Sequence, residues 1–377
     1  MDPVVLDITE NNNILTFTIS DINVSYANAL RRVILSDIPT VVFRTTPYEK
    51  NDATIEINTS RLNNEILKQR LSCIPIHIND LEMPLEDYVV ELDVHNNTDT
   101  IMYVTTGNFK IKNIKTDKYL HDDIVKGIFP PNNITKQYID FCRLRQKLSD
   151  NIPGEHLKLS CLLSIGTAKE NGSFNVVSTC SYHNTPDANK IEEEYATKEE
   201  ELKLKYTENE DVKYHLQDWL NLDAKRIYIS NSYNFKIETI GVFGNMEIVL
   251  TAIKNIINRL KKVIEIYTNQ NNLIANSEST IQNCFDVILE NEDYTIGKIM
   301  EATLYETYYL GNQSLSFCGF IKPHPHINIS IIRLGFKQPT EKNTVVEYIT
   351  TTASNAIKYY MKLLHLMGGS SSGSNEN

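Results

Sequence analysis

The chain has 377 residues, 41% of them hydrophobic and 23% charged, so it is long enough to bury a sizeable core and to form two or three domains. Its formal net charge of -11 argues against a protein whose main task is to grip DNA, because neutralising phosphates requires clustered Lys and Arg. No apolar run approaches the ~18 residues of a membrane-spanning helix, and a signal-peptide pattern is missing from the first residues. We therefore expect a protein of the cytosol or nucleus that acts through other proteins.

The cysteines are scattered singly along the chain, without a C-x-x-C pair. Such spacing predicts neither a zinc ribbon nor a dense disulfide framework. We expect reduced, mostly buried thiols, and no metal or other cofactor bound by this chain. The six positions are Cys73, Cys142, Cys161, Cys180, Cys284 and Cys318.

The N-terminal segment has the pattern of a β-hairpin followed by a helix. Residues 4–8 and 15–19 alternate apolar with other side chains on either side of an Asn-rich turn. Residues 25–35 then place Leu30 and Ile34 at helical spacing, after a stretch rich in capping side chains. We therefore predict a helix there, with one apolar stripe and a basic shoulder.

A strand follows, and then a second helix with a cap region at 58–60 and an end near Pro75, after which the pattern changes. Residues 81–154 consist of short apolar runs broken by loops, which predicts an inserted β-rich subdomain. Residues 187–223 carry twelve acidic side chains against five lysines. Such a run is typical of a solvated helix or a flexible excursion, and a docking segment for a basic partner is the functional alternative.

The second half of the chain repeats the alternation of strands and helices. A strand near 235–240 and a long amphipathic helix follow the acidic run, and the polar residues 268–282 then indicate a linker. Residues 283–367 predict a second α+β unit: a strand, a helix, two strands and a closing helix over about 343–366. The Gly- and Ser-rich tail, 368–377, is predicted to be disordered.

The chain therefore contains one plan twice: a strand, a helix, a strand pair and a long closing helix, with the insertion in the first copy only. Two such units can pack helix against helix and bury their apolar stripes. We predict an α+β fold with two dimerisation units in one chain. The residues expected at the contact between the units are Leu30, Ile34, Ile256, Leu260, Ile357, Tyr360 and Leu364.

Several segments resemble, in order and spacing, the alpha-like subunits of cellular RNA polymerases. Residues 26–39, Tyr-Ala-Asn-Ala-Leu-Arg-Arg-Val-Ile-Leu-Ser-Asp-Ile-Pro, look like the signature helix of bacterial alpha, archaeal D and the third subunit of RNA polymerase II. Residues 58–76 and 154–170 are similar to the family's next two motifs. Farther on, 293–297 and 317–325 resemble the family's smaller pairing partner, which is archaeal L or subunit eleven of RNA polymerase II.

The resemblance implies domain limits. Residues 1–80 and 155–267 would form the subunit-three-like dimerisation domain, with 187–223 as an acidic insertion, and 283–367 the subunit-eleven-like domain. Two departures stand out: Lys298 replaces the usual Asn, and the insertion lacks the cysteine cluster of many cellular relatives. Fusion of both halves resembles the arrangement in poxviruses, African swine fever virus and mimivirus-like viruses, and the AT-biased composition fits. A viral protein would work in the host cytoplasm and virion, and any other in the nucleus.

The resemblance also implies a non-catalytic assembly platform that docks the largest and second-largest polymerase subunits and small subunits. Arg31 and Arg32 lie about 100° apart on a helix, so at least one can leave the apolar stripe and bind carboxylates of a partner. A solvated shoulder is the alternative. Arg70 has an implied packing or partner role, or is a surface arginine. Asn28 is grouped with the three arginines as a partner-docking residue, and its alternatives are that it caps a backbone group or faces water.

No catalytic constellation emerges from the residues. The pair Asp122 and Asp123 lacks a third carboxylate, so we interpret it as solvated loop charge, and no P-loop pattern is present. His324 and His326 flank a proline without further ligands, which favours a turn between strands. We expect no sequence-specific nucleic-acid contact and no membrane contact. An acidic binding module outside the polymerase, or a stand-alone nucleotide-handling enzyme, are the alternative functions.

Overall fold

The computed structural model describes residues 2–149, 151–269 and 271–368, which form two compact units. Unit 1 comprises Met1–Val33, Thr179–Glu238 and Val249–Asn377, and unit 2 comprises Ile34–Ser178 and Thr239–Ile248. The mixture of helices and largely antiparallel sheets confirms the predicted α+β class. Except for Gly368, the tail predicted to be disordered lies outside the described residues. None of the described helices is long and apolar enough to cross a membrane.

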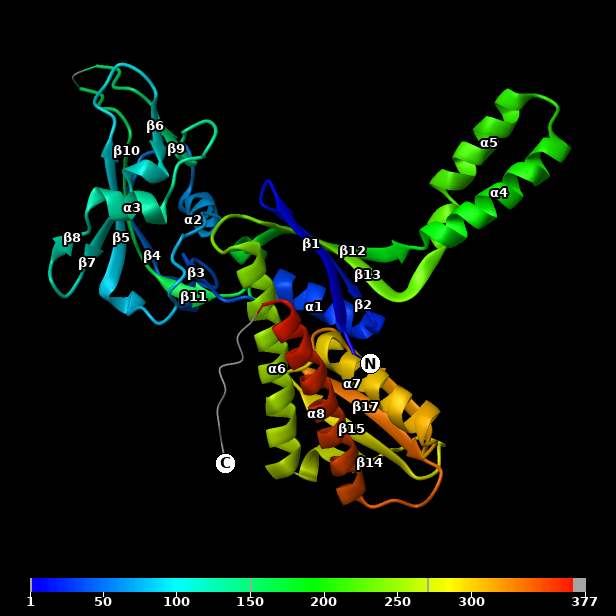
Figure 1. The fold of residues 1–377 in the computed structure, drawn as a ribbon. Coiled ribbons are helices and arrows are strands. Elements are labelled where there is room, and N and C mark those ends of the chain that lie inside the picture. The colour runs from blue at the N-terminus through cyan, green and yellow to red at the C-terminus, as the bar shows by residue number, and fades with distance from the viewer. Residues whose placement is uncertain (1, 150, 270, 369–377) are drawn as a thin grey trace. The chain divides into compact units, whose positions relative to one another are not determined.

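Unit 1 contains two four-stranded sheets that have the same strand order (Figure 1). If the four strands of each sheet are numbered along the chain, they lie side by side in the order first, second, fourth, third. A helix follows the second strand in each case, and a 25-residue helix follows the fourth. In spatial order the strands are β1 (Val4–Asn11), β2 (Ile14–Ser20), β13 (Tyr228–Thr239) and β12 (Val177–Pro186), then β14 (Ile274–Asn276), β15 (Cys284–Glu290), β17 (Ile329–Phe336) and β16 (Leu315–Ile321).

The helices after the second strands, α1 (Val24–Ser36) and α7 (Tyr294–Leu304), begin with the same local structure. A residue with φ of 58° follows the preceding strand directly, Asp21 in one case and Asn291 in the other. Asp and Asn are among the residues that adopt this left-handed conformation most readily. Two residues later, a side-chain oxygen caps the helix, because Asn23 Oδ1 accepts from Ser25 N at 2.8 Å and Asp293 Oδ1 from Thr295 N at 2.9 Å.

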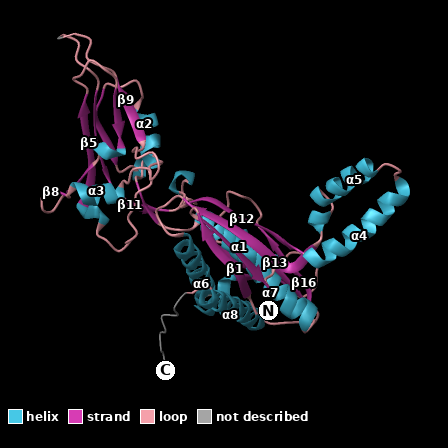
Figure 2. Ribbon diagram, turned by 45° about the horizontal axis from the view of Figure 1, so that its top comes forward, coloured by secondary structure: helices cyan, strands magenta, loops and turns pink. Residues whose placement is uncertain are grey.

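The long helices α6 (Asn245–Asn269) and α8 (Lys342–Leu366) lie side by side in both views (Figures 1 and 2). Their apolar stripes recur at helical spacing, and the residues facing inward are buried. Of the predicted contact residues, Leu30, Ile34, Ile256, Leu260 and Tyr360 are fully buried and Ile357 is 9% exposed. Leu364 is only partly covered, whereas its neighbour Leu363 is fully buried.

Polar contacts between α1 and both downstream helices close the core of unit 1. The hydroxyls of Tyr26 and Thr303 share a hydrogen bond of 2.6 Å, and Asn23 Nδ2 donates to Glu306 Oε1 at 2.7 Å in the π-helical segment Tyr305–Gly311. Tyr360 of α8 stacks on the Tyr26 ring and donates its hydroxyl hydrogen to the Tyr26 carbonyl at 3.0 Å. The buried hydroxyls of Tyr26, Thr303 and Tyr360 are therefore paired, as a low-dielectric core favours.

Unit 2 is built around a five-stranded sheet that extends beyond residues 81–154. A strand after that range, residues 156–162, pairs with residues 88–95 inside it and with residues 53–58 before it. The sheet runs β4 (Ala53–Asn58), β10 (His156–Leu162), β5 (Tyr88–His95), β7 (Lys110–Asn113) and β8 (Lys118–Tyr119). The remaining elements are the pairs β3 (Thr40–Val42) with β11 (Ser164–Gly166) and β6 (Met102–Thr105) with β9 (Asp140–Leu144), and helices α2 (Asn64–Ser72) and α3 (Asp122–Ile128).

The acidic run forms a helical hairpin, so of the two structures expected for it the helix is the one found. Helices α4 (Ala188–Lys205) and α5 (Asn209–Asn221) follow β12 and precede β13 (Figure 1). A small cluster holds the hairpin together: Leu202, Val212 and Leu216 are buried, with Tyr195 and Tyr206 packed against them. The expected linker also contains structure, since β14 lies within residues 268–282 and pairs with β15.

Removing a buried side chain from α6 should destabilise the protein far more than removing an exposed one. Leu260→Ala should lower the free energy of unfolding by about 2 to 5 kcal/mol, because Leu260 is fully buried and leaves a cavity. Leu204→Ala on α4, where the side chain is 91% exposed, is the matched control and should change it by less than about 0.5 kcal/mol. Urea denaturation measures both, and equal effects would contradict the assigned burial.

The buried hydroxyl of Tyr26 should make stability fall at alkaline pH. Burial raises the pKa of Tyr26 to about 12, although its hydrogen bond to Thr303 opposes the rise. Because the pKa in the folded state exceeds the ordinary value near 10, stability is intact below pH ~10 and is lost as the pH rises toward ~12.

Tyr26→Phe removes this ionisation and should therefore lessen the fall in unfolding free energy between pH ~10 and ~12, by up to about 3 kcal/mol. Urea titrations of both proteins across this range measure the difference. Tyr228→Phe, at a half-exposed tyrosine of β13, serves as the control and should leave the wild-type slope unchanged. Parallel curves for Tyr26→Phe and wild type would show that Tyr26 does not ionise with unfolding.

Candidate protein-docking site

Helix α1 presents its two arginines in different directions. Its apolar stripe, which includes Ala27, Leu30 and Val33, is completely buried. Arg31 and Arg32 flank that stripe and are each partly exposed. Because successive residues are turned by about 100° around a helix, the two guanidinium groups reach different surroundings.

Arg31 is held in place by a neutral group. Its Nε and Nη2 both donate to Asn28 Oδ1, one helical turn earlier, at 3.0 and 2.9 Å. The Asn28 side-chain oxygen therefore accepts from Arg31 and orients the arginine. Within the described ranges, no carboxylate oxygen lies within 4.0 Å of the Arg31 guanidinium. A partly buried positive charge is therefore fixed in direction but not neutralised by an acid.

The positive charge of Arg31 affects the pKa values of two side chains on β12, Cys180 and Tyr182. Burial raises the pKa of the Cys180 thiol to about 12, and the nearby positive charge of Arg31 opposes the rise. Burial likewise raises the pKa of Tyr182, again against the influence of Arg31. Neither side chain supplies an anion at neutral pH, so β12 does not compensate the guanidinium.

Arg32 points to the downstream half of unit 1. Its Nε donates to Thr295 Oγ1 at 3.0 Å and its Nη2 donates to Asp293 Oδ2 at 3.2 Å, both at the start of α7. The side chain is thus used inside the chain, 263 residues away in sequence from its hydroxyl partner. Of the two arginines, Arg32 has a carboxylate partner, whereas Arg31 donates to a neutral amide.

Asp293 belongs to a charge cluster that the sequence did not reveal. Besides capping α7 and binding Arg32, its Oδ1 lies 3.8 Å from Arg259 Nη2 of α6. Arg259 also forms a bidentate ion pair with Glu292, and both side chains are only about 15% exposed. The only hint of this cluster in the sequence was the pair of adjacent acids, Glu292 and Asp293, before a helix. Their arginine partners lie far away in the sequence.

Arg70 forms its hydrogen bonds within unit 2. From α2, its Nε donates to the Phe141 carbonyl and its Nη2 to the Asp140 carbonyl, both at 2.7 Å. These two bonds satisfy carbonyls of β9 and anchor the helix beside that strand. Its position corresponds to the packing role, one of the alternatives the sequence left open.

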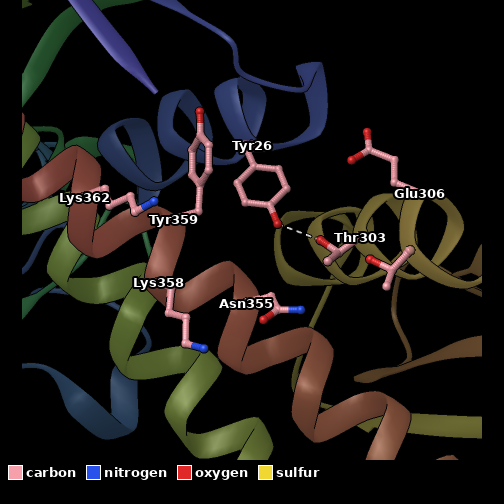
Figure 3. A pocket seen from close by; sticks show the side chains of 8 residues that line it. Tyr26, Thr303, Glu306, Asn355, Lys358, Tyr359 and Lys362 are labelled. Carbon is pink, nitrogen blue, oxygen red and sulfur yellow. Dashed lines mark hydrogen bonds between the residues drawn. The ribbon is translucent and has the colours of Figure 1, made fainter. Parts of the chain in front are cut away.

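A shallow cavity of about 280 Å³ lies beside the Tyr26–Thr303 hydrogen bond (Figure 3). Lys358 and Asn355 project toward it from α8, and Glu306 lies on the opposite side. Lys362, also on its rim, pairs with Asp2. The lining is polar and of mixed charge, which suits contact with polar protein surface rather than an apolar small molecule.

The other residues considered for metal binding or catalysis lie apart from α1. Asp122 and Asp123 are exposed, but they form the first turn of α3, so their expected placement in a loop was wrong. His324 and His326 lie in the turn between β16 and β17, as predicted. Across residues 2–149, 151–269 and 271–368, no three His, Cys, Asp or Glu side chains gather as a metal site would require.

Residues 16–260 match a family described as the RNA polymerase Rpb3/Rpb11 dimerisation domain. The DNA-directed RNA polymerase subunit Rpo3 of Pyrococcus furiosus is 26% identical over 272 residues, which cover 66% of this chain and 91% of the relative. Subunit 3B of DNA-directed RNA polymerases IV and V of Arabidopsis thaliana is 27% identical, covering 52% of this chain and 61% of its own length.

DNA-directed RNA polymerase II subunit RPB3 of Schizosaccharomyces pombe is 25% identical, covering 47% of this chain and 58% of its own length. The chain thus spans about three fifths of the Arabidopsis and fission-yeast relatives and nearly all of the archaeal one. The matched segment includes α1 with both arginines, α2 with Arg70, and most of α6. The chain belongs to the RNA polymerase Rpb3/Rpb11 dimerisation-domain family.

Proposed function

We propose that this chain is a non-catalytic assembly subunit of a DNA-directed RNA polymerase, and that it carries both halves of the alpha-like pair in one polypeptide. The family membership and the names of the relatives support the first part. Catalysis belongs, in this proposal, to the largest and second-largest subunits, which dock on unit 1 together with small subunits.

The two sheets of unit 1 support the fused arrangement. Both have the strand order first, second, fourth, third, and both are followed by a 25-residue helix. The turns before α1 and α7 share their left-handed residue and their capping geometry. Two unrelated segments have no physical reason to agree in topology and in local turn structure together, so a repeated unit accounts for them best.

The surroundings of Arg31 are the main support for a docking surface on α1. Its guanidinium is oriented by Asn28, partly buried, and without a carboxylate partner among the described residues. A carboxylate from a neighbouring polymerase subunit would complete it with short, charge-assisted hydrogen bonds. Pre-orientation by Asn28 lowers the side-chain entropy lost on binding, which favours affinity at this position.

The source and location form the finer part of the proposal. Fusion of both halves and the Asn-, Ile- and Lys-rich composition support an origin in a large DNA virus. The protein would then work in the host cytoplasm and be packaged in the virion, whereas a cellular protein would work in the nucleus. The acidic hairpin α4–α5 supports a second candidate function, a binding module outside the polymerase, because it folds around its own small core.

Separate substitutions of the two arginines should give different defects. Arg31→Ala should abolish copurification of the two largest polymerase subunits while changing the free energy of unfolding by less than about 1 kcal/mol, because its contact within the chain is to one neutral amide. Arg32→Ala should lower the unfolding free energy by about 1 to 2 kcal/mol, since it removes the guanidinium that binds Asp293 and Thr295.

Affinity purification of tagged full-length protein from its native source, with quantitation of the two largest subunits, provides the measurement. Arg226→Ala, at an exposed arginine that pairs with Asp223 one helical turn away, is the control and should leave both stability and copurification unchanged. Undiminished recovery of both subunits with Arg31→Ala would refute the assigned docking role. If wild type brings down neither subunit but does bring down basic proteins, the binding-module function replaces the polymerase one.

A further inference from the structure

We propose that the α1–α7 contact is built to pair unlike units, so that the upstream unit accepts the downstream unit and rejects a second copy of itself. The inference rests on the two-unit arrangement proposed above, but not on docking to polymerase subunits. It assigns the choice of partner to a few polar side chains, and it predicts how a chain carrying two similar units avoids pairing like with like.

The two helices can be aligned residue by residue without a gap. Asp21 and Asn291 occupy the same left-handed position, and Asn23 and Asp293 make the same cap. Continuing this alignment places different chemistry at each contact position. The equivalent pairs are Tyr26 with Ile296, Arg32 with Ala302, Val33 with Thr303, and Ser36 with Glu306.

The contacts observed between α1 and α7 follow an antiparallel, two-fold pattern. Asn23 meets Glu306, Tyr26 meets Thr303, and Arg32 meets Asp293 and Thr295, so the start of each helix lies against the end of the other. The pair related to Tyr26–Thr303 by the two-fold pattern is Ile296 with Val33, and both of these side chains are fully buried. The interface thus has the geometry of a symmetric dimer with unlike side chains at its equivalent positions.

Two upstream units paired in this geometry would leave polar groups unmatched. The Tyr26 hydroxyl of one copy would face Val33 of the other instead of Thr303, and a buried hydroxyl without a partner is costly. Arg32 would face Asn23 and would find no carboxylate there. The upstream unit therefore has a physical preference for a partner that supplies Thr303 and Asp293.

Two downstream units would meet an opposing charge. In the symmetric geometry Asp293 of one copy would lie where Asn23 lies, beside Glu306 of the other, and two carboxylates at that distance repel. In the unlike pair, the neutral Asn23 donates to Glu306 and the cationic Arg32 binds Asp293. Attraction in the correct pair and repulsion in the wrong one together give specificity.

The test uses the full chain with a protease site introduced between α6 and β14 and cleaved after purification. Isotope-labelled and unlabelled cleaved proteins are mixed, urea is raised until their pieces have exchanged completely and is then removed, and native mass spectrometry counts like and unlike pairs. Wild type should give unlike pairs, with like pairs at least about tenfold below the statistical share. Like pairs at the statistical share in wild type would overturn the proposal.

The decisive variant is Asp293→Asn with Glu306→Gln, which keeps the size of both side chains and the cap while removing the repulsion. Pairs of two downstream pieces should then rise by at least about tenfold. Glu192→Gln with Glu193→Gln on the exposed face of α4 is the matched control and should not change the count. An unchanged count in the decisive variant would also overturn the proposal.

A second variant, Tyr26→Phe with Thr303→Val, removes the hydroxyl pair without a large change of volume and should raise pairs of two upstream pieces. An unchanged count of these pairs would refute the assigned role of the hydroxyls. Loss of polymerase docking, as expected for Arg31→Ala, leaves the pair count unaffected. Failure of the docking proposal and failure of this inference are therefore separable.

Discussion

The carboxylate of Asp293 is the interaction on which the arrangement of unit 1 depends. One oxygen caps α7 and lies near Arg259 of α6, and the other accepts from Arg32 of α1. A partly buried carboxylate is tolerated only when it is paired and hydrogen-bonded, so these contacts cannot be lost one at a time without penalty. The positions of α1, α6 and α7 are therefore coupled through a single side chain.

Apolar burial and polar contacts contribute differently to this unit. Each large side chain in the stripes of α6 and α8 contributes ~1.5 to 3 kcal/mol, so burial supplies most of the attraction. Apolar stripes, however, fit many partners about equally well. The hydroxyl pair of Tyr26 and Thr303 and the charge cluster at Asp293 add direction and register, which burial alone does not provide.

Much of the fold could be predicted from periodicity, because amphipathic helices and alternating strands leave a local pattern. The helix predicted over 25–35 is α1, and the closing helix predicted over about 343–366 is α8, each correct to within one residue at either end. The burial of Leu30, Ile256 and Tyr360 followed from the same stripes. Docking to a partner through Arg31 remains a prediction.

What the sequence did not reveal involves residues far apart in the chain. The spacing around Arg32 shows only that it leaves the apolar stripe, and its partners lie more than 260 residues away. Strand β14 was hidden in the expected linker, since three residues are too few for a periodic pattern and only pairing with β15 defines it. The extent of the unit 2 sheet was missed for the same reason, because β4 and β10 join it only through long-range pairing.

The pairing of β2 with β13 also sets the order in which the chain can fold during synthesis. Thr18 and Asn234, hydrogen-bonded across these strands, are 216 residues apart, and nearly all of unit 2 lies between them in sequence. The sheet of unit 2 closes once β10 has left the ribosome, whereas the N-terminal hairpin must wait for β13. The earliest residues made are therefore among the last to reach their final place.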